Sequence, residues 1–470
     1  MAKNSEIMTS PSGSTLEEAE NFLAAHPDIE AFDIVLTDTN GVGRGKIIRR
    51  SELLAIYEGG RNFPISVLGL DITGEDVHET GLVWETGDGD LRAWPLPGTL
   101  LPLHATSPAR GQVLLSLYTL DDHPMTSDPR HALARQVEAL AARGLHPAGA
   151  FELEFFLLAN ERDTEGNVQP AAAVLDGRAS RKTEVYSVDH LHGMEPLFAD
   201  IYAAAEAQKI PVETLISEFA PGQYELTLHY RKNVVRAADD LILLKRLVRT
   251  QARRHGVTAC FMAKPIEKYA GSGMHFHVSL SDDAGNNAFV GPGDDAGNWS
   301  PTIRHAIGGL AATMAETMLV FAPHANSWRR FVSGSYAPVA PSWGVNNRSV
   351  AFRIPAGDAK SRRIEHRPSG VDANPYLVAA TVLAGIIKGL DEQLNPGPET
   401  TGNGYAQSAD TSSIPKDWRS AIEAAEGSDF LKAALGNDLH RTFTAIKRAE
   451  YQRVARTVSA LDYELYLHEV

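Results

Sequence analysis

The sequence is nearly free of cysteine and contains no long apolar run. Its single cysteine, Cys260, excludes an intramolecular disulfide and fits a reducing compartment. The first fifteen residues are polar and predict no signal peptide. The most apolar stretch, 310–322, is shorter than the roughly 18 residues of a membrane span and contains Glu316. We therefore expect a buried helix there, no membrane attachment and a cytoplasmic protein.

An excess of positive charge is also missing, since the formal net charge is −15. Nucleic acid is therefore not an expected partner, because proteins hold phosphate backbones with basic surfaces. With 43% hydrophobic and 22% charged residues, the chain has the composition of a globular protein and not of a disordered one. The chain has 470 residues, which is longer than a single hydrophobic core usually accommodates, so at least two domains are predicted.

Residues 17–116 are predicted to form a small α+β domain. The spacing of apolar residues favours a helix over 17–26, with Thr15 as its N-cap. Strands are predicted over 33–36 and 45–48, separated by a turn that contains Asn-Gly.

Residues 124–470 are predicted to form a larger domain of mixed strands and helices, introduced by an apolar helical pattern over 129–143. Segment 394–413 is polar and rich in Gly and Pro, so it is predicted to be a loop, and the last 40 residues to be helical. The expected strands are 149–158, 224–229, 275–280, 349–354 and 363–367. The expected helices are 193–208, 235–255, 301–320 and 374–391.

Two short segments each carry a pair of glutamates. In 151–155, Phe-Glu-Leu-Glu-Phe, the alternation of a strand places Glu152 and Glu154 on one face. In 218–225, a Pro-Gly turn can return the chain so that Glu218 and Glu225 meet. Neighbouring carboxylates repel unless a cation intervenes. The alternatives are a solvated strand face and an ordinary turn between surface acids.

Segment 271–279, Gly-Ser-Gly-Met-His-Phe-His-Val-Ser, leads from glycines into a strand. His275, His277 and Ser279 fall on one face of that strand. Imidazole is a common metal ligand and can donate to phosphate, whereas a single histidine is more often structural. The paired histidines favour a site.

An arginine-rich region runs from 329 to 367 in this otherwise acidic chain. Arginine binds carboxylate and phosphate in a bidentate manner, so the region suits an ATP-dependent reaction at a carboxylate. No Gly-x-x-x-x-Gly-Lys-Ser/Thr motif is present, which excludes a P-loop enzyme. A solvated basic face is the alternative. The cluster consists of Arg329, Arg330, Arg348, Arg353, Arg362, Arg363 and Arg367.

Taken in order, these segments resemble the glutamine synthetase family over nearly the whole chain. The motifs that carry the resemblance are Glu-Leu-Glu-Phe-Phe, Gly-Gln-Tyr-Glu, Gly-Ser-Gly-Met-His-Phe-His, Asn-Asn-Arg-Ser and Arg-Arg-Ile-Glu-His-Arg. The resemblance implies an α+β fold with an N-terminal β-grasp domain and a catalytic domain. It also implies a dodecamer of two hexameric rings, with active sites between neighbouring subunits. The implied substrates are glutamate, ATP and an amine.

The resemblance further assigns site residues. Two or three Mg²⁺ or Mn²⁺ ions are implied for each active site. The implied ligands of one metal are Glu154, Glu218 and Glu225, and those of the second are Glu152, His275 and Glu365. The implied nucleotide contacts are His277, Ser279, Arg353 and Arg363. The implied glutamate contacts are Gly271, Arg330 and Arg367. Arg348 is matched to stabilisation of the transferring phosphoryl group, and Asp38 to acceptance of the amine's proton across a subunit interface.

The departures from the family bear on the amine. In the flap 334–338, Gly-Ser-Tyr-Ala-Pro, Tyr336 stands where ammonia-using members carry a glutamate. An aromatic side chain suits an alkyl chain or organic cation better than ammonium. Ala270 replaces an asparagine near the glutamate site, and no adenylylation segment is recognisable near 392–400.

Segments 336–338, 341–348, 353–355, 385–391 and 402–404 are most similar to the gamma-glutamyl-polyamine (putrescine) branch of the family. We therefore expect a glutamate–amine ligase for an organic amine. The alternatives are a synthetase that uses ammonia and a catalytically silent structural homologue. An enzyme that acts on another acid is a further alternative, since function resides in the site.

Overall fold

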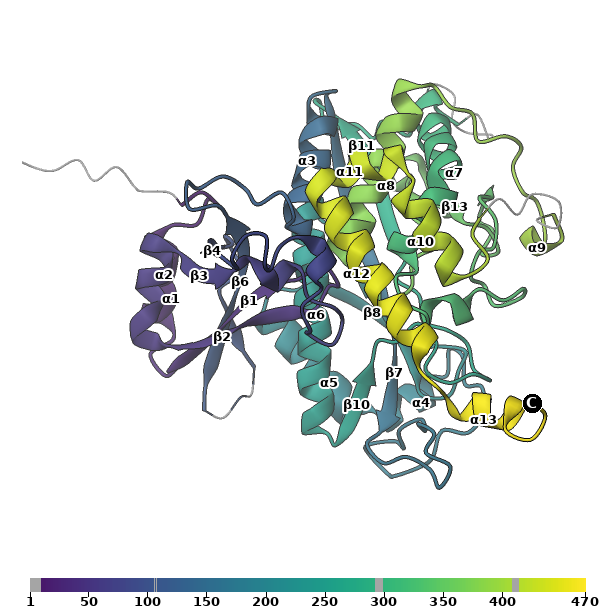
Figure 1. The fold of residues 1–470 in the computed structure, drawn as a ribbon, viewed down its shortest axis with the longest axis horizontal. Coiled ribbons are helices and arrows are strands. Elements are labelled where there is room, and N and C mark those ends of the chain that lie inside the picture. Colours follow the sequence, from purple (N-terminus) through teal and green to yellow (C-terminus); the bar gives the residue numbers. More distant parts are fainter. Residues whose placement is uncertain (1–9, 105, 107, 292–298, 408–413) are drawn as a thin grey trace, which may run out of the picture.

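The computed structural model describes residues 10–104, 106, 108–291, 299–407 and 414–470 (Figure 1). Two mixed sheets organise the chain, a six-stranded one formed before residue 119 and an eight-stranded one formed after residue 144. Among the described residues, no helix is both long and apolar enough to cross a membrane.

The first sheet has the order β2-β1-β6-β4-β3, and β5 also pairs with β6. Its strands are β1 (Ala31–Thr37), β2 (Gly43–Arg49), β3 (Arg61–Pro64), β4 (Asp90–Pro95), β5 (Leu101–Leu103) and β6 (Arg110–Tyr118). As predicted, β1 and β2 form an antiparallel hairpin around the Asn-Gly turn, where Gly41 has a φ of +78°.

Two helices pack on this sheet, α1 (Leu16–Ala25) and α2 (Leu53–Gly59). Apolar side chains of both helices, such as Ala19 and Ile56, share one core with the strands. The predicted cap of α1 is confirmed, because the Thr15 hydroxyl accepts a hydrogen bond from the Glu18 amide.

The second sheet has the order β12-β13-β14-β11-β7-β9-β8, and β10 pairs with the end of β7. Its strands are β7 (Leu145–Ala159), β8 (Val212–Ser217), β9 (Gln223–Leu228), β10 (Val257–Cys260), β11 (Phe276–Asp282), β12 (Trp343–Val345), β13 (Phe352–Ile354) and β14 (Ile364–His366). The long strand β7 connects the two halves of the sheet, since it pairs with β11 on one edge and with β9 on the other.

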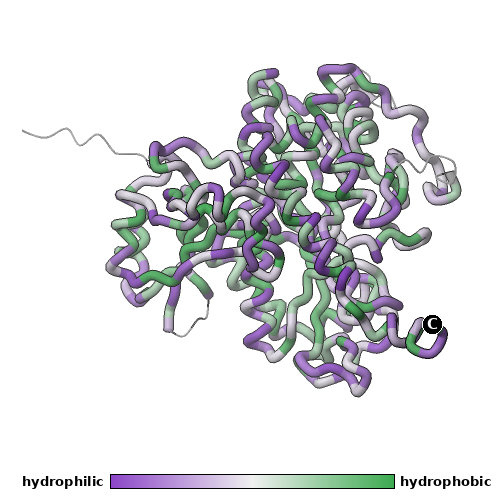
Figure 2. Tube along the Cα trace, in the orientation of Figure 1, coloured by the Kyte–Doolittle hydropathy of each residue, from purple (hydrophilic) through white to green (hydrophobic). Residues whose placement is uncertain are grey.

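Helices cover the second sheet and supply most of its core (Figure 1). The helices after residue 119 are α3 (Pro129–Ala141), α4 (Val188–Gly193), α5 (Glu195–Ala207), α6 (Val234–Arg254), α7 (Pro301–Phe321), α8 (Pro375–Asp391), α9 (Gly404–Gln407), α10 (Trp418–Glu426), α11 (Asp429–Leu435), α12 (Asn437–Arg456) and α13 (Ala460–Tyr466). Of these, α4 and α13 have no buried residues. Short 3-10 turns occupy Arg50–Glu52, Ile65–Leu68, His78–Thr80, Ser327–Arg330 and Ala359–Ser361. Figure 2 shows hydrophobic segments concentrated where strands and helices meet.

The predicted helices and strands are confirmed to within a few residues, except at two places. The strand expected over 349–354 begins only at Phe352, because the Ser349 amide and hydroxyl both donate to the Asn347 side chain and hold a turn. The loop expected over 394–413 contains the short helix α9, and residues 408–413 lie outside the described part of the chain. The apolar stretch 310–322 is confirmed as part of the buried helix α7.

Helices α7 and α8 approach closely enough for their backbones to touch. A Cβ atom added to Gly309 would overlap the Gly385 carbonyl oxygen and lie 2.6 Å from the Gly389 amide nitrogen. Backbone carbonyls of packed helices cannot move aside as a flexible side chain can. Glycine is therefore required where the two helices cross.

We predict that Gly309→Ala lowers the free energy of unfolding by about 2 kcal/mol or more through overpacking. Gly59→Ala is the matched control, because Gly59 is an exposed helical glycine with nothing within 4 Å of its added Cβ. The control should be neutral or stabilising by about 0.5 kcal/mol. Denaturant unfolding of both variants checks this, and equal stability of the two would contradict the close crossing.

Candidate active site

Four neighbouring strands, β14, β11, β7 and β9, bring together the acidic and histidine side chains predicted from the sequence. In the pairing register, Glu154 on β7 lies opposite Glu225 on β9. On the other side of strand β7, His277 on β11 lies opposite Glu365 on β14. Side chains of adjacent strands at matched register point to the same face. Segments more than 200 residues apart therefore contribute to one cluster.

Glu152 lies at the centre of this cluster and contacts both histidines. One carboxylate oxygen is 2.7 Å from His275 Nδ1, and the other is 2.8 Å from His277 Nε2. Burial raises the pKa of Glu152, but the electrostatic interaction with His277 and the hydrogen bonds of both imidazoles outweigh burial and hold the pKa well below its usual range. Glu152 is therefore held as a carboxylate.

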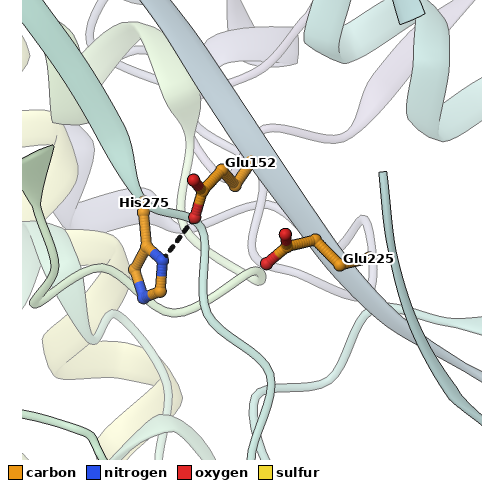
Figure 3. A group of neighbouring side chains, drawn as sticks. All are labelled: Glu152, Glu225 and His275. Carbon is orange, nitrogen blue, oxygen red and sulfur yellow. Dashed lines mark hydrogen bonds and ion pairs between the residues drawn. The ribbon is translucent and has the colours of Figure 1, made fainter. Parts of the chain in front are cut away.

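Two sets of side chains that share Glu152 have the geometry to hold a metal ion. In Glu152, Glu225 and His275, one ligand atom of each residue lies within 4.8 Å of the others, and Figure 3 shows the three side chains converging. The second set is Glu152, His277 and Glu365, under the same distance limit. Carboxylate oxygens with one imidazole suit a divalent cation.

Glu365 is neutralised by arginines from the region that the sequence singled out. Arg353 donates to one carboxylate oxygen at 2.7 Å, and Arg367 donates to the other. Burial would raise the pKa of Glu365, but His277 and Arg367 lower it to about 2. The side chain is almost completely buried, so it depends on these cations to remain charged.

The carboxylates around β9 lack such compensation. Burial, followed by repulsion from Glu152 and Glu154, raises the pKa of Glu225 well above its usual range. Burial and the nearby Glu154 likewise raise the pKa of Glu218 to about 7, partly opposed by Arg348. A divalent cation placed among these carboxylates would relieve the repulsion, so the donor set fits a metal site.

Glu154 is fixed by the glycine-rich segment. Its carboxylate accepts a hydrogen bond of 2.6 Å from the Gly273 amide. A Cβ on Gly273 would lie 2.9 Å from an Arg330 nitrogen and 3.1 Å from His275 Nε2. The absence of a side chain at Gly273 therefore lets the backbone approach both residues.

His277 and Arg363 lie on the side of the cluster away from β9. Arg363 Nε donates to His277 Nδ1 over 3.1 Å, which leaves His277 Nε2 to donate its proton to Glu152. His277 thus belongs to the second group of side chains with metal-binding geometry, and its contact with nucleotide phosphate stays a prediction. Ser279 follows two residues later, opposite Ala148, and is half-buried.

The residues predicted to position glutamate lie next to one another. Arg330 is buried and donates to the carbonyls of Pro368 and Arg367 over 2.9 and 3.2 Å. A Cβ on Gly271 would lie 2.7 Å from the Ala263 carbonyl oxygen and 2.9 Å from Arg330 Cγ. Glycine is therefore required at position 271 for the chain to pass Arg330.

Sequence reasoning missed Gln223, which connects two of the motifs. Its side-chain amide donates to the Gly271 carbonyl over 2.9 Å and to the Ser272 hydroxyl over 3.2 Å. Gln223 belongs to the Gly-Gln-Tyr-Glu motif that carries Glu225, and that motif was the available signal. The buried amide links β9 to the glycine-rich approach of β11.

Tyr336 lies in the flap with its side chain 62% exposed and a φ of +60°. Arg367 Nη2 donates to the Tyr336 carbonyl over 3.4 Å, which ties the flap to the arginine that neutralises Glu365. Tyr405 contacts the next flap residue and was not anticipated, because its segment was expected to be an unstructured loop. Its hydroxyl donates to the Ala337 carbonyl over 2.9 Å.

Asp38 lies apart from this cluster, in the β1–β2 turn. Its side chain is 0% exposed and accepts hydrogen bonds from the amides of Asn40 and Val42 and from Arg44 Nε, each at 2.8 or 2.9 Å. Burial raises the pKa of Asp38, and Arg44 opposes that rise. Within the described residues of this single chain, no hydrogen bond or ion pair joins Asp38 to the glutamates and histidines. Its role therefore stays a prediction that requires a second subunit.

Known proteins share the sequence and the fold. Residues 126–466 match the family model for the glutamine synthetase catalytic domain. Gamma-glutamylputrescine synthetase PuuA of Escherichia coli (strain K12) is 40% identical over 96% of this chain and 94% of its own length. Gamma-glutamylethanolamide synthetase GlnA4 of Streptomyces coelicolor is 31% identical over 94% of this chain and 93% of its own. A solved structure of GmaS with ADP has a TM-score of 0.82 at 27% identity, and the match covers 98% of this chain and 100% of that one.

We predict that the protein stripped of divalent ions loses thermal stability as the pH rises from about 5 to 8. The pKa of Glu218 rises from 4.5 to about 7 on folding. The protonated carboxyl therefore contributes fully to the free energy of unfolding below pH 4.5, and this contribution is lost as the pH passes about 7. The melting midpoint should fall by about 3 °C over this range, and Mn²⁺ should abolish the fall.

Thermal melts at several pH values, with EDTA or with Mn²⁺, measure this effect. Glu218→Gln should flatten the dependence because the amide does not titrate. Glu20→Gln, at an exposed position of α1, is the control and should leave the dependence unchanged. A stability of the metal-free protein that rises toward pH 8 would contradict the repulsion among these carboxylates.

Proposed function

Because the chain belongs to the glutamine synthetase family, we propose that it joins the γ-carboxylate of glutamate to an organic amine at the expense of ATP. The reaction would proceed through γ-glutamyl phosphate, which the amine then attacks. One observation carries the choice of amine. The flap exposes an aromatic side chain, Tyr336, and not a carboxylate. The relatives PuuA and GlnA4, named for putrescine and ethanolamide products, support an organic amine.

The cluster of glutamates and histidines would serve the phosphoryl-transfer step. Glu152, Glu225, His275 and Glu365, with Glu154 and Glu218 beside them, would hold two or three Mg²⁺ or Mn²⁺ ions. When bound, these cations supply the positive charge that neutralises ATP phosphates and the transferring phosphoryl group. The fit rests on the uncompensated carboxylates around β9.

The arginines of the chain would complete the charge balance around the nucleotide and glutamate. Arg353 is oriented by its contacts with Glu365 and with the Asn346 side chain, 2.7 and 3.0 Å away. Arg348 is exposed on the loop between β12 and β13, which precedes Arg353, and would stabilise charge that develops on the phosphoryl oxygens. Arg330, Arg367 and Gly271 would position glutamate, while Arg363, His277 and Ser279 would face the nucleotide.

The amine would approach next to the flap. The ring of Tyr336 offers a face to an alkyl chain or an organic cation, and such contacts contribute about 0.5–1 kcal/mol at exposed positions. A nucleophilic amine must be neutral, so a proton acceptor is required. We propose Asp38 of a neighbouring subunit as that acceptor, which requires its turn to open toward the site.

The larger organisation follows the family. We propose an N-terminal β-grasp domain over 17–116, a catalytic domain over 124–470 and a dodecamer of two hexameric rings in the cytoplasm. The exposed apolar side chains of the C-terminal segment support assembly, because such a surface is rarely left to solvent. They include Leu461, Tyr463, Leu465, Tyr466 and Leu467.

The test is phosphate release from ATP and glutamate with Mg²⁺, measured with each of several amines. The panel comprises ammonia, methylamine, isopropylamine, ethanolamine, putrescine, spermidine and spermine. We expect kcat/KM for one organic amine to exceed that for ammonia by at least about 100-fold, or about 2.7 kcal/mol. Turnover with ammonia alone would identify an ammonia-using synthetase. No phosphate release with any amine would indicate a silent homologue.

We predict that Tyr336→Glu shifts selectivity toward ammonia by at least about 10-fold, because it replaces an aromatic surface with a carboxylate that attracts ammonium. The measurement is the ratio of kcat/KM for ammonia to that for the preferred amine. Tyr202→Glu is the control, since Tyr202 is 37% exposed on helix α5. An unchanged ratio in Tyr336→Glu would contradict the role of the flap.

A further inference from the structure

The segment Glu399 to Tyr405 lies between two functional loops of the proposed site. Its last residue, Tyr405, reaches the flap, where its hydroxyl donates to the Ala337 carbonyl over 2.9 Å. Burial raises the pKa of this hydroxyl, which therefore remains a hydrogen-bond donor at neutral pH. The contact joins positions 68 residues apart in the sequence.

The same segment is bound firmly to the loop that carries Arg348. The Asn347 side-chain amide donates to the carbonyls of Thr400 and Gly402 over 3.0 and 2.9 Å. The Gly404 amide donates to the Ser349 hydroxyl over 2.9 Å, and a Cβ on Gly404 would lie 2.7 Å from the Ser349 carbonyl oxygen. Tyr405 thus lies at the end of a segment that hydrogen bonds hold against the loop carrying Arg348.

The flap needs such a support because Tyr336 is in a strained conformation. Its φ of +60° lies in the left-handed region, which costs a non-glycine residue of order 1 kcal/mol or more and persists only when its surroundings impose it. Two contacts flank the strained residue. Arg367 donates to the carbonyl of Tyr336, and Tyr405 donates to the carbonyl of Ala337. The contact from Tyr405 is the shorter, at 2.9 Å against 3.4 Å.

We propose that Tyr405 is a positioning residue that holds the flap in its strained conformation and thereby sets the selectivity of the site for amine over water. The proposal rests on the proposed function. With the flap held, the amine nitrogen attacks the γ-carbonyl carbon of γ-glutamyl phosphate, the C–O bond to phosphate breaks, and the γ-glutamyl amide, phosphate and a proton are formed. With the flap released, water attacks the same carbon, the C–O bond to phosphate breaks, and glutamate, phosphate and a proton are formed.

The experiment is Tyr405→Phe, which keeps the ring and removes only the hydroxyl. We expect the KM for the preferred amine to rise at least about 5-fold, while the KM for ATP changes less than about 2-fold. Phosphate release without any amine should increase at least about 3-fold, because the intermediate is then open to water. Amide hydrogen exchange over 332–338 should become faster.

Two further variants distinguish a positioning role of the Tyr405 hydroxyl from nonspecific destabilisation of the protein. Tyr202→Phe removes a hydroxyl exposed on helix α5 and should leave all four quantities unchanged. Tyr336→Gly relieves the strain at positive φ. In that background, Tyr405→Phe should accelerate amide hydrogen exchange of the flap much less than Tyr405→Phe does in the wild-type protein. An equal acceleration in both backgrounds would overturn the proposal.

The outcomes distinguish this proposal from the proposed function. Wild-type values of amine KM, amine-independent phosphate release and flap exchange in Tyr405→Phe would overturn the role of Tyr405 alone. Failure of the wild-type enzyme to release phosphate with any amine would overturn the proposed function. In that case the exchange measurement still decides whether Tyr405 holds the flap.

Discussion

Electrostatic repulsion among buried carboxylates is the constraint around which this structure is arranged. Glu152, Glu154 and Glu225 come from adjacent strands whose register brings them together, and Glu365 joins them across β11. Unpaired buried carboxylates cost several kcal/mol each, far more than one hydrogen bond restores. The surrounding strands and loops therefore have to supply positive charge, and they do so unequally on the two sides of β7.

On the β14 side, the protein provides its own compensation. Arg353 and Arg367 contact Glu365, and the two histidines contact Glu152, so the pKa of each carboxyl is lowered. On the β9 side, burial and repulsion from neighbouring carboxylates raise the pKa values of Glu218 and Glu225. On one side of the cluster, side chains of the protein thus compensate the negative charge. On the other side, a cation from solution would supply the missing positive charge. A site that binds metal-bound nucleotide in each cycle benefits from this asymmetry, since fully paired carboxylates would have little affinity left for a cation.

The sequence predicted the members of this cluster better than their partners. Strand alternation was enough to place Glu152 and Glu154 on one face, and the resemblance to a family supplied the other members of the cluster. Neither could show that Arg363 donates to His277 or that Gln223 bridges β9 to Gly271, because these contacts depend on strand order and on the approach of distant loops. The strand expected over 349–354 was too long for a similar reason. Hydrogen bonds of Ser349 to the Asn347 side chain hold a turn at a place where composition favoured extension.

Chemistry and selectivity are separated in this architecture. The charged cluster is built on paired strands, which tolerate little movement and suit a reaction that depends on placing phosphoryl oxygens among fixed charges. The flap is a short loop in a strained conformation, so its position depends on a few contacts and can change without disturbing the strands. Tyr405 and Arg367 connect the two regions, because Tyr405 belongs to the segment bound to the Arg348 loop and Arg367 also neutralises Glu365. Under the proposed function, changes in the flap and its supports would therefore alter which amine is accepted without moving the carboxylates on the paired strands.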